Sequence, residues 1–308
     1  MATLRFLLKR FAAQRLLGLA VVVTLAFSVG VLVAGPIYAD AAREAILSSQ
    51  LAGAAPTVKN ARLQVFGSAT FDWEAADQVI TDRTDSLPLQ QIVRQGLGTV
   101  RLGSTDGPSV TILAREGFEQ HLELRGEMPG ENEVLLHAGV AELLGVRAGD
   151  RLAAIGPTGE RITLTVTGTY VSPDPNDPYW FGSQNPFPAP DSTQPQPALV
   201  SLDTIVGATQ ELGLTTQYSW DVFLDLTGVP FDRVSGVPDQ VARLFSSLQG
   251  EAGLGLSSIT LTSGLGTLLE IVRQRIADLA VPILLVVFQI GAVTLAVLAG
   301  VGALALTR

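Results

Sequence analysis

The sequence predicts a membrane protein in which two transmembrane helices flank an α+β extracytoplasmic domain, an α/β sandwich interrupted by a β-rich insertion. Three observations predict this class: two long uncharged segments, a strong excess of acidic residues between them, and alternating strand-like and helix-like patterns in that middle region.

Both uncharged segments are long enough to cross a bilayer as a helix. Residues 16–39 form a run of 24 uncharged residues, and residues 279–307 form a run of 29. A hydrocarbon core of ~30 Å needs about 20 apolar helical residues. We therefore expect the first span at 16–39 and the second at 279–307.

The basic residues beside the first span predict its orientation. Arg5, Lys9, Arg10 and Arg15 precede it without any acid, and basic residues near a span stay on the cytoplasmic side. Residues 1–15, with apolar side chains on one helical face, are expected as a cytoplasmic amphipathic helix in contact with membrane lipid. Residues 40–278 then lie outside the bacterial cell (inner, cytoplasmic) membrane. A cleaved signal peptide, cut near Ala39 or Ala41, is the alternative.

The charge of the middle region excludes several classes of function. All 29 acidic residues and 15 of the 20 basic residues lie between Asp40 and Asp278, so this region has a formal net charge of −14. Such a domain repels nucleic acid. The chain has no cysteine, which excludes disulfides and cysteine-ligated metals.

The pattern outside the insertion predicts two similar half-domains that share one sheet. The first half is expected to contain a helix over 40–51, a strand over 61–73, a helix over 73–96 with a break at Pro88, and strands over 99–102 and 109–114. The second half is expected to contain a strand over 216–226, a helix over 231–248, a strand over 256–262, and a helix over 265–276 that continues into the second span.

Residues 116–201 have a different pattern and predict a small β-rich subdomain. A strand is expected at 133–137, followed by a helix at 138–144 that Gly145 ends in the left-handed conformation. A hairpin turn is expected at 156–160, because "GPTGE" separates two strand-like runs.

Several stretches of the sequence resemble the FtsX-like or MacB-like permease subunits of ABC transporters. They are "GENEVLLHAGVAELLGVRAGDRL", "ERITLTVTGTYVSPDPNDPYW" and "LTSGLGTLLEIVRQRIADL". The resemblance implies a porter-like part formed by 40–115 and 202–278, with 116–201 inserted. It also implies a cytoplasmic ATPase partner and a second permease copy or remaining permease half. Because the family continues into further spans, the sequence is expected to be the N-terminal part of a longer permease, or one frame of a split one.

Sequence motifs for catalysis and cofactor binding are absent. The chain contains no phosphate-binding Gly-x-x-x-x-Gly-Lys-Ser/Thr, no Gly-x-Ser-x-Gly and no His-Glu-x-x-His. We therefore expect no enzyme activity and no cofactor, with ATP bound by the partner subunit. His121 and His137 could form at best a weak metal site, and the simpler interpretation is that they are surface or strand residues.

The most unusual local stretch is 172–197, which holds eight of the 17 prolines. Its aromatic residues Tyr179, Trp180, Phe181 and Phe187 are candidates for contact with a substrate or partner. The alternative, which we favour, is a structural loop whose rings fold back onto the core. Asp174 and Asp177 are interpreted as turn residues rather than calcium ligands.

Small residues recur every four positions in both spans and predict helix-packing faces. They are Gly30, flanked by Ala26 and Ala34, in the first span, and Ala292, Ala296 and Gly300 in the second. These faces could pack with each other, with further spans, or with a second permease copy. The alternative is simply frequent use of alanine.

Together these expectations describe a permease subunit of the FtsX/MacB mechanotransmission type. ATP hydrolysis by a separate cytoplasmic ATPase would move the extracytoplasmic domain and so export or release a hydrophobic substrate, lipoprotein or peptide. A two-span membrane-anchored ligand sensor is the alternative, and an anchored hydrolase is disfavoured because no nucleophile–base motif is present.

Overall fold

The computed structural model describes residues 15–174, 176–182, 186–188, 192–249 and 259–306. The chain divides into two compact units: a helix pair made of 1–52 and 269–308, and a mixed α/β domain made of 53–268. The expected amphipathic helix at 1–15 lies almost wholly outside the described residues.

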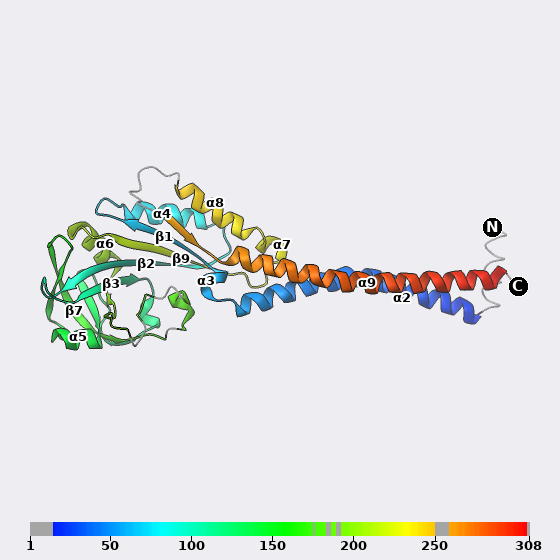
Figure 1. The fold of residues 1–308 in the computed structure, drawn as a ribbon, viewed down its shortest axis with the longest axis horizontal. Coiled ribbons are helices and arrows are strands. Elements are labelled where there is room, and N and C mark those ends of the chain that lie inside the picture. The colour runs from blue at the N-terminus through cyan, green and yellow to red at the C-terminus, as the bar shows by residue number, and fades with distance from the viewer. Residues whose placement is uncertain (1–14, 175, 183–185, 189–191, 250–258, 307–308) are drawn as a thin grey trace. The chain divides into compact units, whose positions relative to one another are not determined.

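The helix-pair unit is built from two very long helices (Figure 1). Helix α2 runs from Arg15 to Gly53 and helix α9 from Leu265 to Leu306, each without interruption. The expected continuation of the first span through 40–51 and the expected helix over 265–276 are both confirmed. Pro282 lies inside α9.

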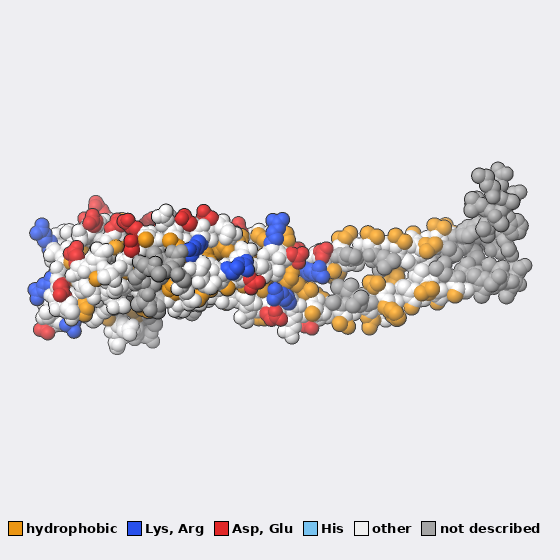
Figure 2. All heavy atoms as spheres, turned by 90° about the horizontal axis from the view of Figure 1, so that it is seen from above, with side chains coloured by type: hydrophobic (Ala, Val, Ile, Leu, Met, Phe, Trp, Pro, Cys, Tyr) orange, Lys and Arg blue, Asp and Glu red, His pale blue; other side chains and the backbone are white. Residues whose placement is uncertain are grey.

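Of the described residues, one helical segment, Val22–Gly53, is long and apolar enough to cross a membrane, a test that an N-terminal signal sequence also passes. Leu285–Val297 is a shorter apolar helical segment. The second span therefore stays a prediction. Figure 2 shows hydrophobic side chains on the visible face of the helix pair, and acidic and basic side chains on the visible face of the α/β domain.

The α/β domain is organised around a single ten-stranded sheet. The strand order is β10-β1-β9-β2-β3-β8-β5-β7-β4, and β6 pairs with both β2 and β7. The strands are β1 (Ala61–Gly67), β2 (Leu89–Leu102), β3 (Ser109–Arg115), β4 (Glu123–Gly126), β5 (Glu133–His137), β6 (Arg151–Ile155), β7 (Arg161–Val171), β8 (Ala198–Leu199), β9 (Thr216–Leu224) and β10 (Ile259–Thr262).

The two expected half-domains share one sheet, as the sequence predicts, and their strands alternate over β10-β1-β9-β2. Strand β1 lies between β9 and β10, and β9 in turn pairs with β2, with antiparallel pairing throughout. The strands of the insertion extend the same sheet, because β8 pairs in parallel with β3 and β5 pairs in parallel with β7.

Two element boundaries were predicted wrongly. The expected helix over 73–96 is helix α4 (Trp73–Thr84) followed by strand β2, so 89–96 are extended rather than helical. The expected strand over 61–73 ends at Gly67, because Asp72 caps α4 by accepting a hydrogen bond from the Ala75 backbone N–H at 3.0 Å.

The remaining helices are short. The expected helix over 231–248 is divided into α7 (Phe231–Val234) and α8 (Val237–Gln249), and the expected helix over 138–144 is α5 (Ala138–Leu144). The others are α3 (Pro56–Lys59), α6 (Leu202–Glu211) and the 3₁₀ turns η1 (Phe118–Gln120) and η2 (Pro178–Trp180).

Gly145 ends α5 as the sequence predicts. Its φ is +67°, and its N–H donates to the carbonyls of Ala141 and Glu142. Glycine adopts this left-handed conformation without the steric cost that a Cβ brings.

The two faces of the central strands are covered differently. Helices α4 and α8 pack on one face, over Leu63 of β1 and Trp220 of β9 (Figure 1). On the other face Val93, Leu113 and Phe223 belong to a second apolar cluster, which includes aromatic residues of the 172–197 loop. This second face positions the candidate site.

Candidate functional site

The aromatic residues of the 172–197 loop are buried against the sheet. Trp180 and Phe181 are 0 % exposed and Tyr179 is 7 % exposed. Phe187 is partly buried and packs edge-on against Trp180, with ring centroids 4.7 Å apart. The structure thus brings all four predicted residues together, with Tyr179, Trp180 and Phe181 buried in the core and Phe187 partly buried against them. This is the arrangement that the structural alternative predicts.

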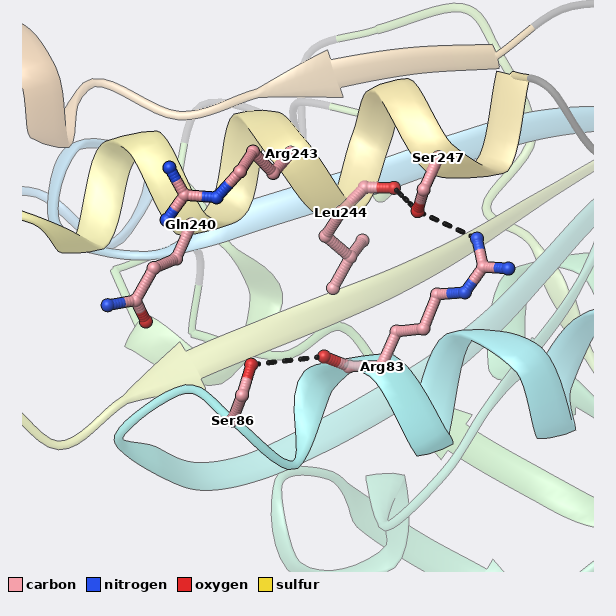
Figure 3. Close-up of a pocket in the computed structure, with 6 residues that line it drawn as sticks. All are labelled: Arg83, Ser86, Gln240, Arg243, Leu244 and Ser247. Atoms are coloured by element: carbon pink, nitrogen blue, oxygen red, sulfur yellow. Dashed lines mark hydrogen bonds between the residues drawn. The ribbon is translucent and has the colours of Figure 1, made fainter.

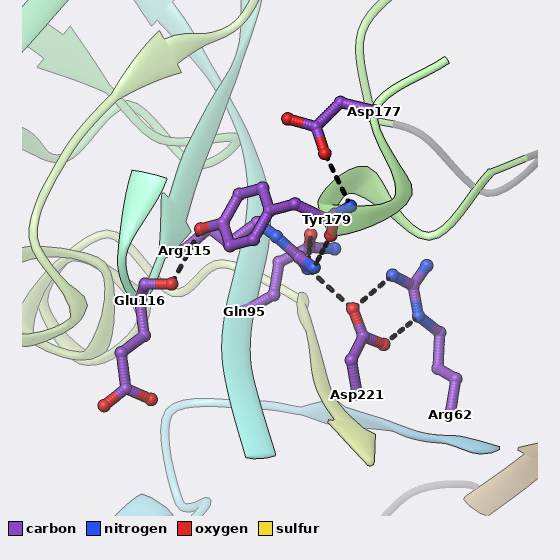
Figure 4. Close-up of polar contacts among 7 residues, drawn as sticks. All are labelled: Arg62, Gln95, Arg115, Glu116, Asp177, Tyr179 and Asp221. Carbon is purple, nitrogen blue, oxygen red and sulfur yellow. Dashed lines mark hydrogen bonds and ion pairs between the residues drawn. The ribbon is translucent and has the colours of Figure 1, made fainter. Parts of the chain in front are cut away.

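Beneath these rings the sheet carries a buried ion network that the sequence did not reveal (Figure 4). Asp221 of β9 is bonded to Arg62 of β1, whose Nη2 lies 2.7 Å from Oδ2, and to Arg115 of β3, whose Nη1 also lies 2.7 Å from Oδ2. The side chains of Asp221 and Arg115 are 0 % exposed and that of Arg62 is 3 % exposed. One signal was available: Asp221 is a charged residue inside the apolar strand "YSWDVFL", so burial would require a partner.

The network holds the loop by both polar and aromatic contacts. Arg115 donates to the backbone carbonyl of Tyr179, and its Cζ lies 4.5 Å from the centroid of the Tyr179 ring. The Arg62 guanidinium lies 4.5 Å from the centroid of the Phe181 ring. Cation–π contacts of desolvated arginines are worth about 2 kcal/mol. The loop is therefore bound to a charged face of the sheet rather than to a purely apolar one.

Asp174 and Asp177 act as turn residues, as predicted. Asp177 caps η2 by accepting from the Tyr179 N–H at 2.9 Å, and Asp174 accepts from the Asn176 N–H at 2.9 Å. Asp177 also pairs with His121, whose ring stacks on Tyr179 with centroids 3.7 Å apart.

The two histidines have different hydrogen-bond partners, Asp177 for His121 and the Gly139 N–H for His137. His137 accepts this hydrogen bond at Nδ1 from the Gly139 N–H at 3.2 Å, and burial lowers its pKa below the usual value. Among the described residues no group of three or more His, Cys, Asp or Glu side chains could hold a metal ion.

A second network supports the helix-covered face. Asp77 of α4 accepts from Arg94 Nε at 2.5 Å and from Trp220 Nε1 at 2.8 Å. The hydrogen bond from Arg94 to Asp77 is the main reason that the pKa of Arg94 is raised. Burial raises the pKa of Tyr218 on the same face, and that of Tyr170 on the opposite side well above the usual value.

An open hollow of about 490 Å³ lies between α4 and α8 (Figure 3). Arg83 crosses it, donating from Nη1 to Ser247 Oγ at 2.7 Å. The lining is polar apart from one leucine and consists of Arg83, Ser86, Gln240, Arg243, Leu244 and Ser247. It contains no histidine, cysteine or carboxylate that could act as a general base for a serine.

The small residues of the helix pair face outward. Gly30, Ala292, Ala296 and Gly300 are exposed, and a Cβ built on either glycine would meet nothing within 4 Å. Of the three possibilities that the sequence left open, packing of these two small-residue faces with each other is not seen in the described residues. Packing against further spans or a second copy stays a prediction. The helices instead contact through polar residues, with Ser28 Oγ 2.6 Å from Thr294 Oγ1.

The half-buried positions of the helix pair explain why the small residues face outward. In α9 they include 287, 290, 294 and 297, a spacing of three and four residues. In α2 they include 28, 35, 39 and 42. This spacing is typical of two helices that pack along one seam. The four small residues singled out from the sequence lie off that seam, whose positions in α2 are other small residues, Ser28, Gly35, Ala39 and Ala42.

The chain segments that adjoin the two long helices meet within the α/β domain. The Gly264 N–H, next to the start of α9, donates to the Thr57 carbonyl of α3 at 3.2 Å. A Cβ at Gly264 would lie 3.0 Å from the Val58 Cα, so a larger residue would require the Val58 backbone to move by a few tenths of an ångström. Asn60, at the end of α3, accepts from the Leu224 N–H of β9 at 3.0 Å. We call Thr57, Asn60 and Gly264 the junction.

Comparison with known proteins gives a partial likeness. No family model matches the chain, and no curated protein matches its sequence. Solved structures that are similar in part include three from proteins named as MacB, YknZ and a permease. The periplasmic region of MacB from Actinobacillus actinomycetemcomitans is 10% identical, with 72% of this chain and 95% of that chain covered and a TM-score of 0.38.

The other two similar structures are also parts of transporter-type proteins. The extracellular domain of the noncanonic ABC-type transporter YknZ from Gram-positive bacteria is 10% identical, with 63% and 100% covered and a TM-score of 0.37. A domain of a protein named as a permease from Porphyromonas gingivalis is 16% identical, with 67% and 91% covered and a TM-score of 0.36. The chain is thus similar in part to domains taken from MacB, YknZ and a protein named as a permease.

Proposed function

We propose that this chain is a membrane subunit of an ABC-type permease of the FtsX/MacB mechanotransmission type. In this proposal a separate cytoplasmic ATPase moves the helix pair, and the movement reaches an extracytoplasmic α/β domain that exports or releases a hydrophobic substrate, lipoprotein or peptide. Residues 1–15 and the far end of α9 lie on the ATPase side of the bacterial cell membrane.

One observation carries the proposal: each apolar segment belongs to a single uninterrupted helix that continues in sequence to the α/β domain. Helix α2 extends 14 residues beyond Ala39, to Gly53, and α9 begins 14 residues before Leu279, at Leu265. A helix is stiff along its axis because its peptide groups are hydrogen-bonded along its length; Pro36 in α2 and Pro282 in α9 each remove one such bond. Displacement at one end is therefore carried to the other end.

The junction gives such a displacement a defined target. It joins the segments next to both helices by the Gly264–Thr57 hydrogen bond, and Asn60 continues the contact to β9. Leu265 and Leu268, in the first turn of α9, are 1 % and 7 % exposed. Movement of either helix would thus act on β1, β9 and β10 rather than on a flexible linker.

The topology is tested by single cysteines, since the chain contains none of its own. Glu160 lies exposed in the β6–β7 hairpin, and Glu160→Cys should react with a membrane-impermeant maleimide in intact cells. Arg5→Cys is the matched control and should react only after permeabilisation. Protection of Glu160→Cys in intact cells would contradict the proposal.

Coupling to ATP is tested at the helix contact. A Ser28→Cys/Thr294→Cys pair should form a disulfide on oxidation, because the two oxygens lie 2.6 Å apart. In native membranes that contain the ATPase, ATP with vanadate should change the rate of cross-linking. A pair placed at Ser68 and Thr70, whose side chains contact within the α/β domain, serves as the control. Equal rates with and without nucleotide would remove the mechanotransmission part of the proposal.

A further inference from the structure

Four polar atoms on the loop-covered face of the sheet lack a hydrogen-bond partner in the described part of the chain. They are Gln95 Nε2, Arg115 Nε, Trp180 Nε1 and Ser219 Oγ. Their residues are at most 2 % exposed, so solvent at the surface does not reach them. A buried polar group without a partner costs about 1–3 kcal/mol, and more when it is charged.

These atoms belong to one cluster. Gln95 of β2 lies directly opposite Arg115 of β3 on one side and opposite Ser219 of β9 on the other. Residues directly opposite in antiparallel strands present their side chains on the same face. Gln95 Oε1 accepts from Arg115 Nη1 at 2.8 Å, and the Trp180 ring centroid lies 5.7 Å from Arg115 Cζ.

The cluster offers donors and almost no acceptors. The Arg115 Nε–H, the Gln95 side-chain NH₂ group and the Trp180 indole N–H can only donate. The carboxylate that balances Arg115 is Asp221, which it shares with Arg62. A water molecule would accept some of these bonds but would bring two hydrogens of its own, and Ser219 Oγ is the one free acceptor among the four atoms.

We propose that Gln95, Arg115 and Trp180 bind a small monovalent anion, chloride under physiological conditions, beneath the 172–197 loop. A halide accepts several hydrogen bonds and donates none, so it matches this set of groups. It also supplies negative charge beside the buried Arg115 guanidinium, which shares the Asp221 carboxylate with Arg62. Bound halide holds the loop against the sheet, since Arg115 also donates to the Tyr179 carbonyl.

Thermal unfolding of the full-length chain in detergent tests the site, with sodium chloride compared with sodium gluconate at equal ionic strength. Equal ionic strength keeps the general screening of the acidic domain the same in both salts. Gluconate is too large for a buried site. Because a ligand that binds the folded state stabilises it by mass action, Tm should rise by about 3–5 °C for each tenfold increase in chloride above its dissociation constant. An identical Tm in both salts would overturn the proposal and leave the cluster filled by water.

Gln95→Glu gives the site its own acceptor while the Arg115 hydrogen bond remains feasible, so chloride dependence should disappear. Gln91→Glu is the matched control, since it makes the same change at an exposed position of the same strand, and it should keep the dependence. If Gln95→Glu does not fold, crystals of the wild-type chain soaked in bromide decide the question. An anomalous peak within hydrogen-bond distance of Arg115 Nε supports the site, and its absence refutes it.

Discussion

Replacing Asp221 with asparagine tests the buried ion network by leaving two guanidinium groups without their shared carboxylate. Asp221 is 0 % exposed and bonds to both Arg62 and Arg115. Removing one partner of a buried ion pair costs about 3–5 kcal/mol, because the remaining charge stays desolvated. In a domain of this size each kcal/mol lowers Tm by about 2–4 °C. The expected loss is therefore about 6–20 °C.

The assay is thermal unfolding of the purified full-length chain, followed by near-ultraviolet circular dichroism. Asp106→Asn is the matched control, since it makes the same change on an exposed turn and should move Tm by no more than about 2 °C. A second variant with Arg62→Met, Asp221→Leu and Arg115→Met removes every charge together and should be far more stable than Asp221→Asn. An Asp221→Asn variant that unfolds within 2 °C of wild type would refute the reasoning.

Three further outcomes are expected. Trp180→Ala should lower the free energy of unfolding by about 3–5 kcal/mol, because it empties the site of a fully buried ring; an unchanged Tm would mean that the loop is not part of the core. Thr294→Val should lower the stability of the helix pair by about 0.5–1 kcal/mol, measured by its denaturation midpoint in detergent. Adding Ser28→Ala to this variant should cause no further loss, because both changes remove the same hydrogen bond. Because folding lowers the pKa of His137, the unfolded chain binds more protons than the folded chain below about pH 6.5. The stability of the fold should therefore fall as the pH is lowered through that value. His137→Asn should reduce this pH dependence, and its side chain can still accept the hydrogen bond from the Gly139 N–H.

Local sequence signals were sufficient for most of the regular elements. Strand β5, helix α5 and its glycine cap follow from alternation, helical spacing and one glycine within a dozen residues. The long helices follow from uninterrupted apolar composition. In these cases the interaction that decides the structure lies within a few residues along the chain.

Long-range contacts decided the elements that were missed. Residues 89–96 have no strong helical or strand periodicity, and their extended form depends on pairing with β9, more than a hundred residues later. The ion network likewise joins Arg62 to Asp221 across 159 positions. A charged residue within an apolar strand indicates that a partner is needed, but it does not indicate which residue provides it.

The helix pair shows a similar limit. The small residues at every fourth position predicted a packing face, yet the contact seam uses Ser28 and Thr294 instead. Two faces of one helix can each satisfy a packing pattern. Which face meets which neighbour depends on the other helices present, and composition alone does not provide that information.

The position of β1 between β9 and β10 has a practical consequence. Arg62 pairs with Thr262, so the chain enters and leaves the sheet at adjacent points. A segment whose ends are neighbours can be removed, and the chain on either side joined by a short linker. It can also be inserted between the two helices of another helical hairpin without any change in strand order. The α/β domain is thus suited to transfer into another protein, and to crystallisation without the long helices and without lipid.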